Sequence, residues 1–141
     1  RTLRRIARAR RCRLLVAGES PDAARRLGAD GVHLRDRSVR GAAQARRLNL
    51  IVSMPVHNPR EARRAACAGT DHALISPLYA TRSHVGAKPL TLRQWLTLAR
   101  MTHAQPVALG GMNLSRWRKL LRHAVGQRFT PGWAAIDAWE S

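Results

Sequence analysis

Acidic residues are scarce in this sequence. Its 141 residues contain 8 Asp and Glu against 26 Lys and Arg, which gives a formal net charge of +18. Only 2 of the basic residues are lysines, and 14 of the arginines lie within the first 50 residues. A charge excess of this size attracts anionic partners, which range from small phosphorylated ligands to nucleic acids.

Aromatic residues, cysteines and long apolar runs are also scarce. At 4% aromatic residues, the chain has little with which to stack single-stranded nucleic acid, and it carries no zinc-finger, helix-turn-helix or RNP pattern. Two cysteines, Cys12 and Cys67, are too few for a disulfide scaffold or a self-sufficient zinc site. No apolar run approaches the roughly 20 residues of a membrane-spanning helix, and no secretory signal is visible. We therefore expect a cytosolic protein that does not span a membrane.

The hydrophobic content of 45% suffices for one folded domain with a core. Short β-like runs alternate with helical runs along the chain. Strands are predicted at residues 12–17, 31–34, 50–56, 73–78, 106–109 and 132–136. Helices are predicted at residues 2–11, 20–28, 38–48, 58–69 and 90–102, and after residue 113. This alternation is typical of parallel βαβ units, which close as a doubly wound sheet or as an eightfold barrel.

Several conspicuous side chains have a structural interpretation. Trp95 and Trp117 fall on apolar helix faces, so we expect them in the core. His33 lies inside a short strand and is interpreted as structural. The remaining histidines outside the loops are expected at the surface; they are His72, His103 and His123.

Four segments point to one known family. They are residues 28–34 (GADGVHL), 56–62 (VHNPREA), 76–84 (SPLYATRSH) and 108–112 (ALGGM). In this order and near this spacing they resemble the family of thiamine phosphate synthases and thiazole tautomerases, over about residues 3–139. The resemblance implies one α/β domain, residues 1–141, of the TIM (β/α)₈-barrel type. It also implies an N-terminally truncated barrel with about six βα units, without its first strand, first helix and second strand.

The resemblance implies a role in thiamine biosynthesis. Family members couple hydroxymethylpyrimidine pyrophosphate to thiazole phosphate, or tautomerise the thiazole phosphate, so the expected partners are small phosphorylated substrates. The implied catalytic residues are His57 and His84. The implied substrate- and phosphate-binding residues are Thr81, Arg82, Ser83, Gly110, Gly111, Ile136 and Asp137.

These residue types suit anionic ligands. Gly110 and Gly111 would let backbone N–H groups approach a phosphate beside the positive N-terminus of a helix. The hydroxyls of Thr81 and Ser83, with Arg82 between them, would hold a pyrophosphate. His57, at the end of a strand, could move a proton near neutral pH. Each group also has a structural alternative. The glycines could form a tight turn without a ligand, the loop with Thr81 and Ser83 could be a solvated surface loop, and His57 could be a packed or capping residue.

The metal-binding residues of the synthase branch are replaced here. That branch has an Asn-Asp pair after the strand at residues 12–16, where this sequence has Ala17 and Gly18. Its second acidic run, after residue 34, is reduced to Asp36 among Arg35, Arg37 and Ser38. Because those carboxylates would hold Mg²⁺, no metal site is predicted, and Mg²⁺ is a cofactor only if the chain acts as a synthase.

A second interpretation is a catalytically degenerate barrel. Such a chain would bind phosphorylated or polyanionic ligands, nucleic acid included, through its Arg-rich surface, although nucleic acid is the less favoured partner. Polyanion binding would weaken by orders of magnitude from low to physiological salt, whereas a pocket for one phosphate would not. Open sheet edges would in addition favour a homo-oligomer.

Overall fold

The computed structural model describes residues 2–18, 20–35, 39–80, 86 and 88–135. Within these ranges, parallel strands and helices alternate along the chain, and each strand pairs with the next in the order β1-β2-β3-β4-β5-β6. The strands are β1 (Leu15–Ala17), β2 (Gly31–His33), β3 (Ile51–Val56), β4 (His72–Ile75), β5 (Gln105–Ala108) and β6 (Gly132–Trp133). The helices are α1 (Thr2–Ala9), α2 (Pro21–Leu27), α3 (Val39–Arg47), α4 (Pro59–Ala68), α5 (Leu92–Thr102) and α6 (Leu114–His123).

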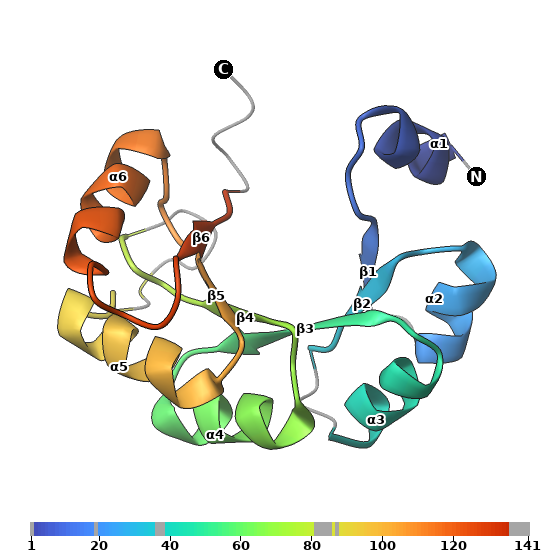
Figure 1. The fold of residues 1–141 in the computed structure, drawn as a ribbon, viewed down its shortest axis with the longest axis horizontal. Coiled ribbons are helices and arrows are strands. Elements are labelled where there is room, and N and C mark those ends of the chain that lie inside the picture. Colours follow the sequence, from blue (N-terminus) through green and yellow to red (C-terminus); the bar gives the residue numbers. More distant parts are fainter. Residues whose placement is uncertain (1, 19, 36–38, 81–85, 87, 136–141) are drawn as a thin grey trace.

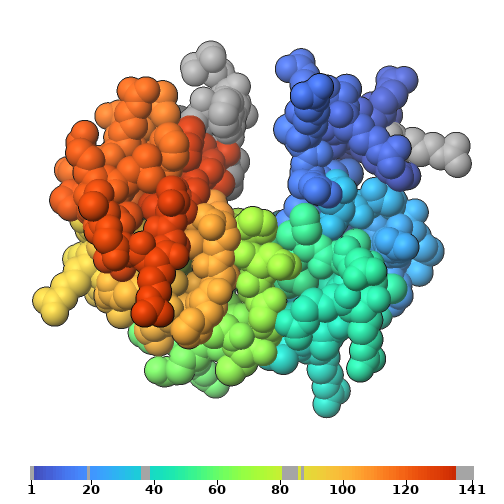
Figure 2. All heavy atoms as spheres, viewed as in Figure 1, coloured from blue at the N-terminus to red at the C-terminus, as the bar shows by residue number. Residues whose placement is uncertain are grey.

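The sheet is curved like part of a barrel wall. Helices α2 to α6 follow one another around its convex side, while β1 and β6 form its two edges (Figure 1). In the space-filling view an open notch separates the N-terminal part, in blue, from the orange and red C-terminal part (Figure 2). A doubly wound sheet would carry helices on both faces. The predicted barrel-type α/β fold is therefore confirmed for the described residues.

The core lies between the sheet and these helices, because alternate strand residues face opposite sides. On β3, Val52, Met54 and Val56 are buried against the helices. Trp95 of α5 is fully buried, as predicted, in the part of the core that contains Val56, and its Nε1 donates to the carbonyl of Ile75 at 3.3 Å. Trp117 is only partly buried and packs at the edge of this core.

Helix boundaries follow the cap residues. Ser20, Asn58 and Asn113 are N-caps, and their side chains accept hydrogen bonds from backbone N–H groups in the first turn, as the sequence predicts. Gly28 and Gly69 end α2 and α4 with φ of 69° and 61°. This left-handed conformation disfavours residues with a Cβ atom, which explains the two glycines.

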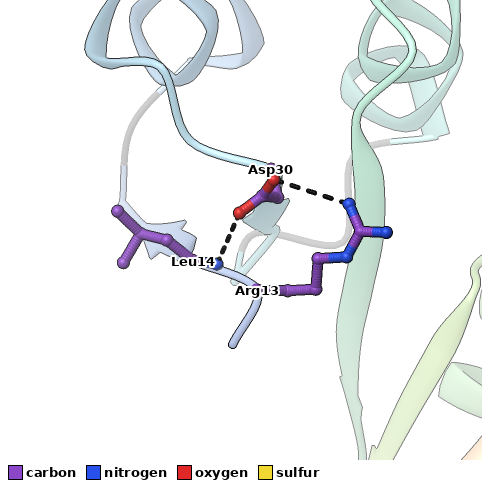
Figure 3. Close-up of polar contacts among 3 residues, drawn as sticks. All are labelled: Arg13, Leu14 and Asp30. Atoms are coloured by element: carbon purple, nitrogen blue, oxygen red, sulfur yellow. Dashed lines mark hydrogen bonds and ion pairs between the residues drawn. The ribbon is translucent and has the colours of Figure 1, made fainter. Parts of the chain in front are cut away.

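Two aspartates fix neighbouring strands just after these helix ends. The Asp30 carboxylate accepts a hydrogen bond from the Leu14 N–H at 2.8 Å and lies 3.6 Å from Arg13 (Figure 3). Asp71 accepts from the Val52 N–H at 2.7 Å in the same way. Each aspartate precedes one strand and fixes the start of the strand before it.

The observed bounds of every strand differ from the predicted ones, and for two strands the structure shows why. The strand predicted at residues 12–17 begins only at Leu15, because Arg11 adopts φ of 52° in a turn and the Leu14 N–H is bonded to Asp30. The strand predicted at 73–78 runs from His72 to Ile75, since Pro77 has no N–H to continue the ladder.

The prediction that His72 lies at the surface is wrong. His72 is half-buried because it is the first residue of β4, paired with Ser53 on β3 and Gln105 on β5. His33, which the sequence pattern indicates is structural, is half-buried on β2. Its Nδ1 lies 2.9 Å from the Ser53 hydroxyl, and alternation along β2 and β3 places this pair on the concave face.

We expect Gly31→Ala to destabilise the fold by about 2 kcal/mol, because it overfills a packed site. A Cβ at Gly31 would lie 2.8 Å from Ile51 Cβ and 2.9 Å from Leu15 Cγ. The matched control is Gly132→Ala, whose Cβ would have an ordinary 3.5 Å contact with Val107 and should shift stability by less than about 0.5 kcal/mol. Urea denaturation measures both, and equal midpoints would contradict the packing argument.

We also expect the stability of the fold to fall as the pH drops below about 6.5, the ordinary pKa of histidine. Burial, and then the charge of Arg35, lower the pKa of His33 in the folded chain. Between the lowered and the ordinary pKa, the unfolded chain binds more protons than the folded chain. A fall in pH therefore favours the unfolded chain, and the free energy of unfolding decreases.

His33→Asn should flatten this part of the pH profile, since the amide can still bond to Ser53 but does not titrate. His123→Asn, which removes an exposed histidine of α6, is the control and should keep the slope. Denaturation midpoints between pH 5 and 8 give the comparison. A decline that persists unchanged in His33→Asn would show that another group causes it.

Candidate functional site

The loops after β3, β4 and β5 lie side by side at the carboxyl edge of the sheet. His57 follows β3, and its Nδ1 donates to the carbonyl of Ser76 at 2.9 Å. The N–H groups of Leu78 and Tyr79, after β4, donate to the carbonyls of Leu109 and Gly110 at 3.0 and 3.1 Å. Hydrogen bonds therefore join three consecutive loops where parallel α/β folds bind their ligands.

Gly110 and Gly111 form the turn between β5 and α6, with φ of 90° and 59°. A Cβ at Gly110 would lie 2.8 Å from the Cα of Pro77, and one at Gly111 would lie 2.6 Å from the carbonyl oxygen of Ala80. Close packing against the loop after β4 thus requires glycine at both positions. This packing alone can explain the two glycines as a tight turn, so a phosphate-binding role for them stays a prediction.

The turn leads into the N-terminus of α6. The Asn113 side chain accepts a hydrogen bond from the Arg116 N–H at 2.9 Å, and the first turn of α6 contains no acidic residue. The Arg116 guanidinium donates from Nη1 to the Gly111 carbonyl and lies 4.4 Å from the centroid of the Tyr79 ring. The helix end and the Arg116 guanidinium therefore both contribute positive potential beside the two glycines.

His57 is held at two points. Its backbone N–H donates to the Glu61 carboxylate at 2.7 Å, and the Glu61 N–H donates to the Asn58 side chain at 3.0 Å. On the imidazole ring, Nδ1 lies 2.9 Å from the Ser76 carbonyl and 3.3 Å from the Ser76 hydroxyl, and because a carbonyl can only accept, the shorter bond places the proton on Nδ1. In the neutral ring Nε2 is then the basic nitrogen, and His57 as a residue is exposed. This arrangement can transfer a proton, although it can equally position the loop after β4.

The other predicted site residues lie outside the described part of the chain. They are the candidate catalytic residue His84 and the candidate binding residues Thr81, Arg82, Ser83, Ile136 and Asp137. Just before Ile136, the Ala134 N–H donates to the Ala108 carbonyl at 2.9 Å. Predictions for these six residues stay predictions.

The described carboxylates do not fit a magnesium site. Asp30 and Asp71 bond to backbone N–H groups at the opposite edge of the sheet, and Glu61 bonds to the His57 N–H. Asp22, on α2, accepts a hydrogen bond from Gln44. No group of three His, Cys, Asp or Glu residues that could hold a metal occurs among the residues searched, which are those the structure describes.

The sequence interpretation missed Tyr79 and Arg116. Tyr79 is the only tyrosine of the chain, and Arg116 is the third residue of a helix that begins directly after a Gly-Gly turn. A cation at that end of a helix is electrostatically unfavourable. That position is the one sequence signal that could have singled out Arg116.

None of the helices in the described part of the chain combines the length and the apolar character needed to cross a membrane. This agrees with the absence of long apolar runs in the sequence.

Comparisons with known proteins extend the resemblance seen in the motifs. The thiamine monophosphate synthase family profile matches residues 1–129. The thiamine-phosphate synthase of Anaeromyxobacter dehalogenans is 37% identical over 107 residues, which cover 72% of this chain and 47% of that protein. The thiamine-phosphate synthase of Leuconostoc citreum is 32% identical over 114 residues, covering 79% of this chain and 54% of that one.

A solved structure has a similar fold. A thiamine phosphate pyrophosphorylase from Pyrococcus furiosus superposes with a TM-score of 0.74 at 23% identity, over 95% of this chain and 62% of that chain. The chain thus spans about half the length of the curated relatives it matches. Since the family profile matches most of its residues, the chain belongs to the thiamine monophosphate synthase family.

Proposed function

We propose that the chain binds small phosphorylated intermediates of thiamine biosynthesis at the carboxyl edge of its sheet, as a thiamine phosphate synthase-type protein. The observation that supports this most is the Gly110-Gly111 turn, with positive φ at both glycines, at the N-terminus of α6 and bonded to the loop after β4. Backbone amides in such a turn can approach a phosphate closely, and the helix end adds positive potential. Family membership supplies the class of ligand.

The synthase reaction is the first candidate. The bond from the pyrimidine methylene carbon to the pyrophosphate oxygen breaks, pyrophosphate leaves, and the thiazole nitrogen bonds to that carbon. Thr81, Arg82, Ser83 and His84 would hold the departing pyrophosphate, as the family resemblance implies. A phosphate at Gly110 and Gly111 would orient the thiazole.

A proton transfer on the thiazole phosphate is the second candidate, and the anchored imidazole of His57 favours it. With Nδ1 bonded to Ser76, the neutral ring offers Nε2 as the base. The misfit between the described carboxylates and a magnesium site also makes a metal-independent reaction the simpler one for these residues.

Ligand-dependent thermal unfolding tests the proposal. A ligand that binds only the folded chain stabilises it by about 2.7 kcal/mol at a concentration of 100 times Kd. We expect thiazole phosphate to raise the melting temperature equally with and without Mg²⁺. An equal titration with sulfate separates specific binding from general attraction to a chain of charge +18.

The other outcomes have definite meanings. A Mg²⁺-dependent shift with hydroxymethylpyrimidine pyrophosphate would show that metal ligands lie outside the described residues, and would support the synthase reaction. If a cooperatively melting chain showed no shift with any of the phosphorylated ligands, the proposed function would be wrong.

His57→Asn separates proton transfer from positioning. The Asn side-chain amide can replace Nδ1–H as the donor to Ser76 but supplies no base at the Nε2 position. If His57 transfers the proton, we expect turnover of thiazole phosphate to fall by about 10²-fold or more, with an unchanged ligand-induced shift in melting temperature. His103→Asn, which replaces an exposed histidine at the end of α5, is the control. Unchanged turnover in His57→Asn would show that His57 does not transfer the proton and only positions the loop after β4.

A further inference from the structure

One arginine side chain contacts both loops to which the proposed function assigns anionic groups. The guanidinium of Arg116 donates to the carbonyl of Gly111, in the turn before α6. The same guanidinium stacks over Tyr79, with its carbon 4.4 Å from the ring centroid. Tyr79 lies in the loop after β4, two residues before Thr81. This inference rests on the proposed function, because it concerns the same site.

The place of Arg116 on its helix is unusual. It is the third residue of α6, where the helix end is positive, and no acidic residue in the first turn offsets its charge. The basic residues Arg122 and His123 lie in the last turn, where the helix end is negative and favours them. The contacts with Gly111 and Tyr79 therefore hold Arg116 where helix electrostatics alone would disfavour a cation.

The hydrogen bond to Gly111 also sets the direction of an amide. In a trans peptide the carbonyl and the following N–H point in opposite directions. Fixing the Gly111 carbonyl therefore fixes the Met112 N–H, which lies just before the N-cap residue Asn113. The stacking on Tyr79 fixes the other loop against the same guanidinium.

We propose that Arg116 is a positioning residue that couples the two anion-binding loops. It sets the orientation of the turn at Gly111 and ties the loop after β4 to that turn. Loss of either contact should loosen both loops together, and should weaken binding of an anion at each of them.

The test uses the full chain, with two measurements. Hydrogen exchange at the Tyr79 N–H, which donates to the Gly110 carbonyl, reports the pairing of the loops without any ligand. Calorimetry with inorganic phosphate and with inorganic pyrophosphate, at fixed ionic strength, reports the anion sites. We expect Arg116→Gln and Tyr79→Leu each to accelerate exchange and to weaken both affinities by about twofold to fivefold, the range of an exposed cation–π contact.

Three controls separate this role from general effects of charge and stability. Arg118→Gln removes the same charge from an exposed position on the same helix and should stay within a factor of about two of the parent chain. Tyr79→Phe keeps the ring and should bind as the parent does. In the double variant, Arg116→Gln with Tyr79→Leu, the loss should not exceed that of Arg116→Gln alone, because that single change already removes the contact with Tyr79.

The outcomes distinguish the two proposals. If Arg116→Gln matches Arg118→Gln in exchange and in affinity, the positioning role is overturned. A parent chain that binds neither anion, while Arg116→Gln still accelerates exchange at Tyr79, would overturn the proposed function and keep the coupling of the loops. Thermal unfolding of each variant shows whether it is folded, so a loss of affinity in a folded variant counts as support.

Discussion

The turns that lead from a helix into the next strand set the geometry on which the site depends. Gly28 and Gly69 end their helices in the left-handed conformation, and two residues later Asp30 and Asp71 each accept a backbone N–H of the neighbouring strand. These bonds fix the register of parallel strands at the amino edge of the sheet. Because register is shared along a strand, the carboxyl edge is aligned as well, and the loops that carry His57, Ser76 and Gly110 meet there.

The same turns account for part of the arginine excess. Arg46 donates to the carbonyl of Ala68 at the end of α4, and Arg4 lies against Gly28 at the end of α2. Cations near the carboxyl end of a helix are stabilising. Arg116, near the amino end of α6, also has partners within the fold, which are the Gly111 carbonyl and the Tyr79 ring. Several arginines thus have partners within the fold, so a net charge of +18 is not by itself a measure of the surface available to a polyanion.

The sequence predicts what depends on neighbours along the chain, and misses what depends on distant ones. Alternating strands and helices, the N-caps at Ser20, Asn58 and Asn113 and the burial of Trp95 all follow from local patterns. The start of β1 could not be predicted, because Asp30 takes the Leu14 N–H. Motifs located His57, Gly110 and Gly111, but the contact of Arg116 with Tyr79 joins two helix–strand units that no periodicity connects.

The small number of acidic residues affects both the fold and the candidate site. Each described carboxylate has a hydrogen-bonding partner within the chain, and the two at the amino edge, Asp30 and Asp71, are needed there for strand register. A magnesium ion that neutralised a pyrophosphate would need oxygen ligands at the opposite edge, where the family resemblance implies an Asn-Asp pair and this sequence has Ala17 and Gly18. Charge on a bound phosphate would instead be balanced by backbone amides, a helix end and an arginine. Those groups bind an anion without polarising a leaving group as a divalent cation does.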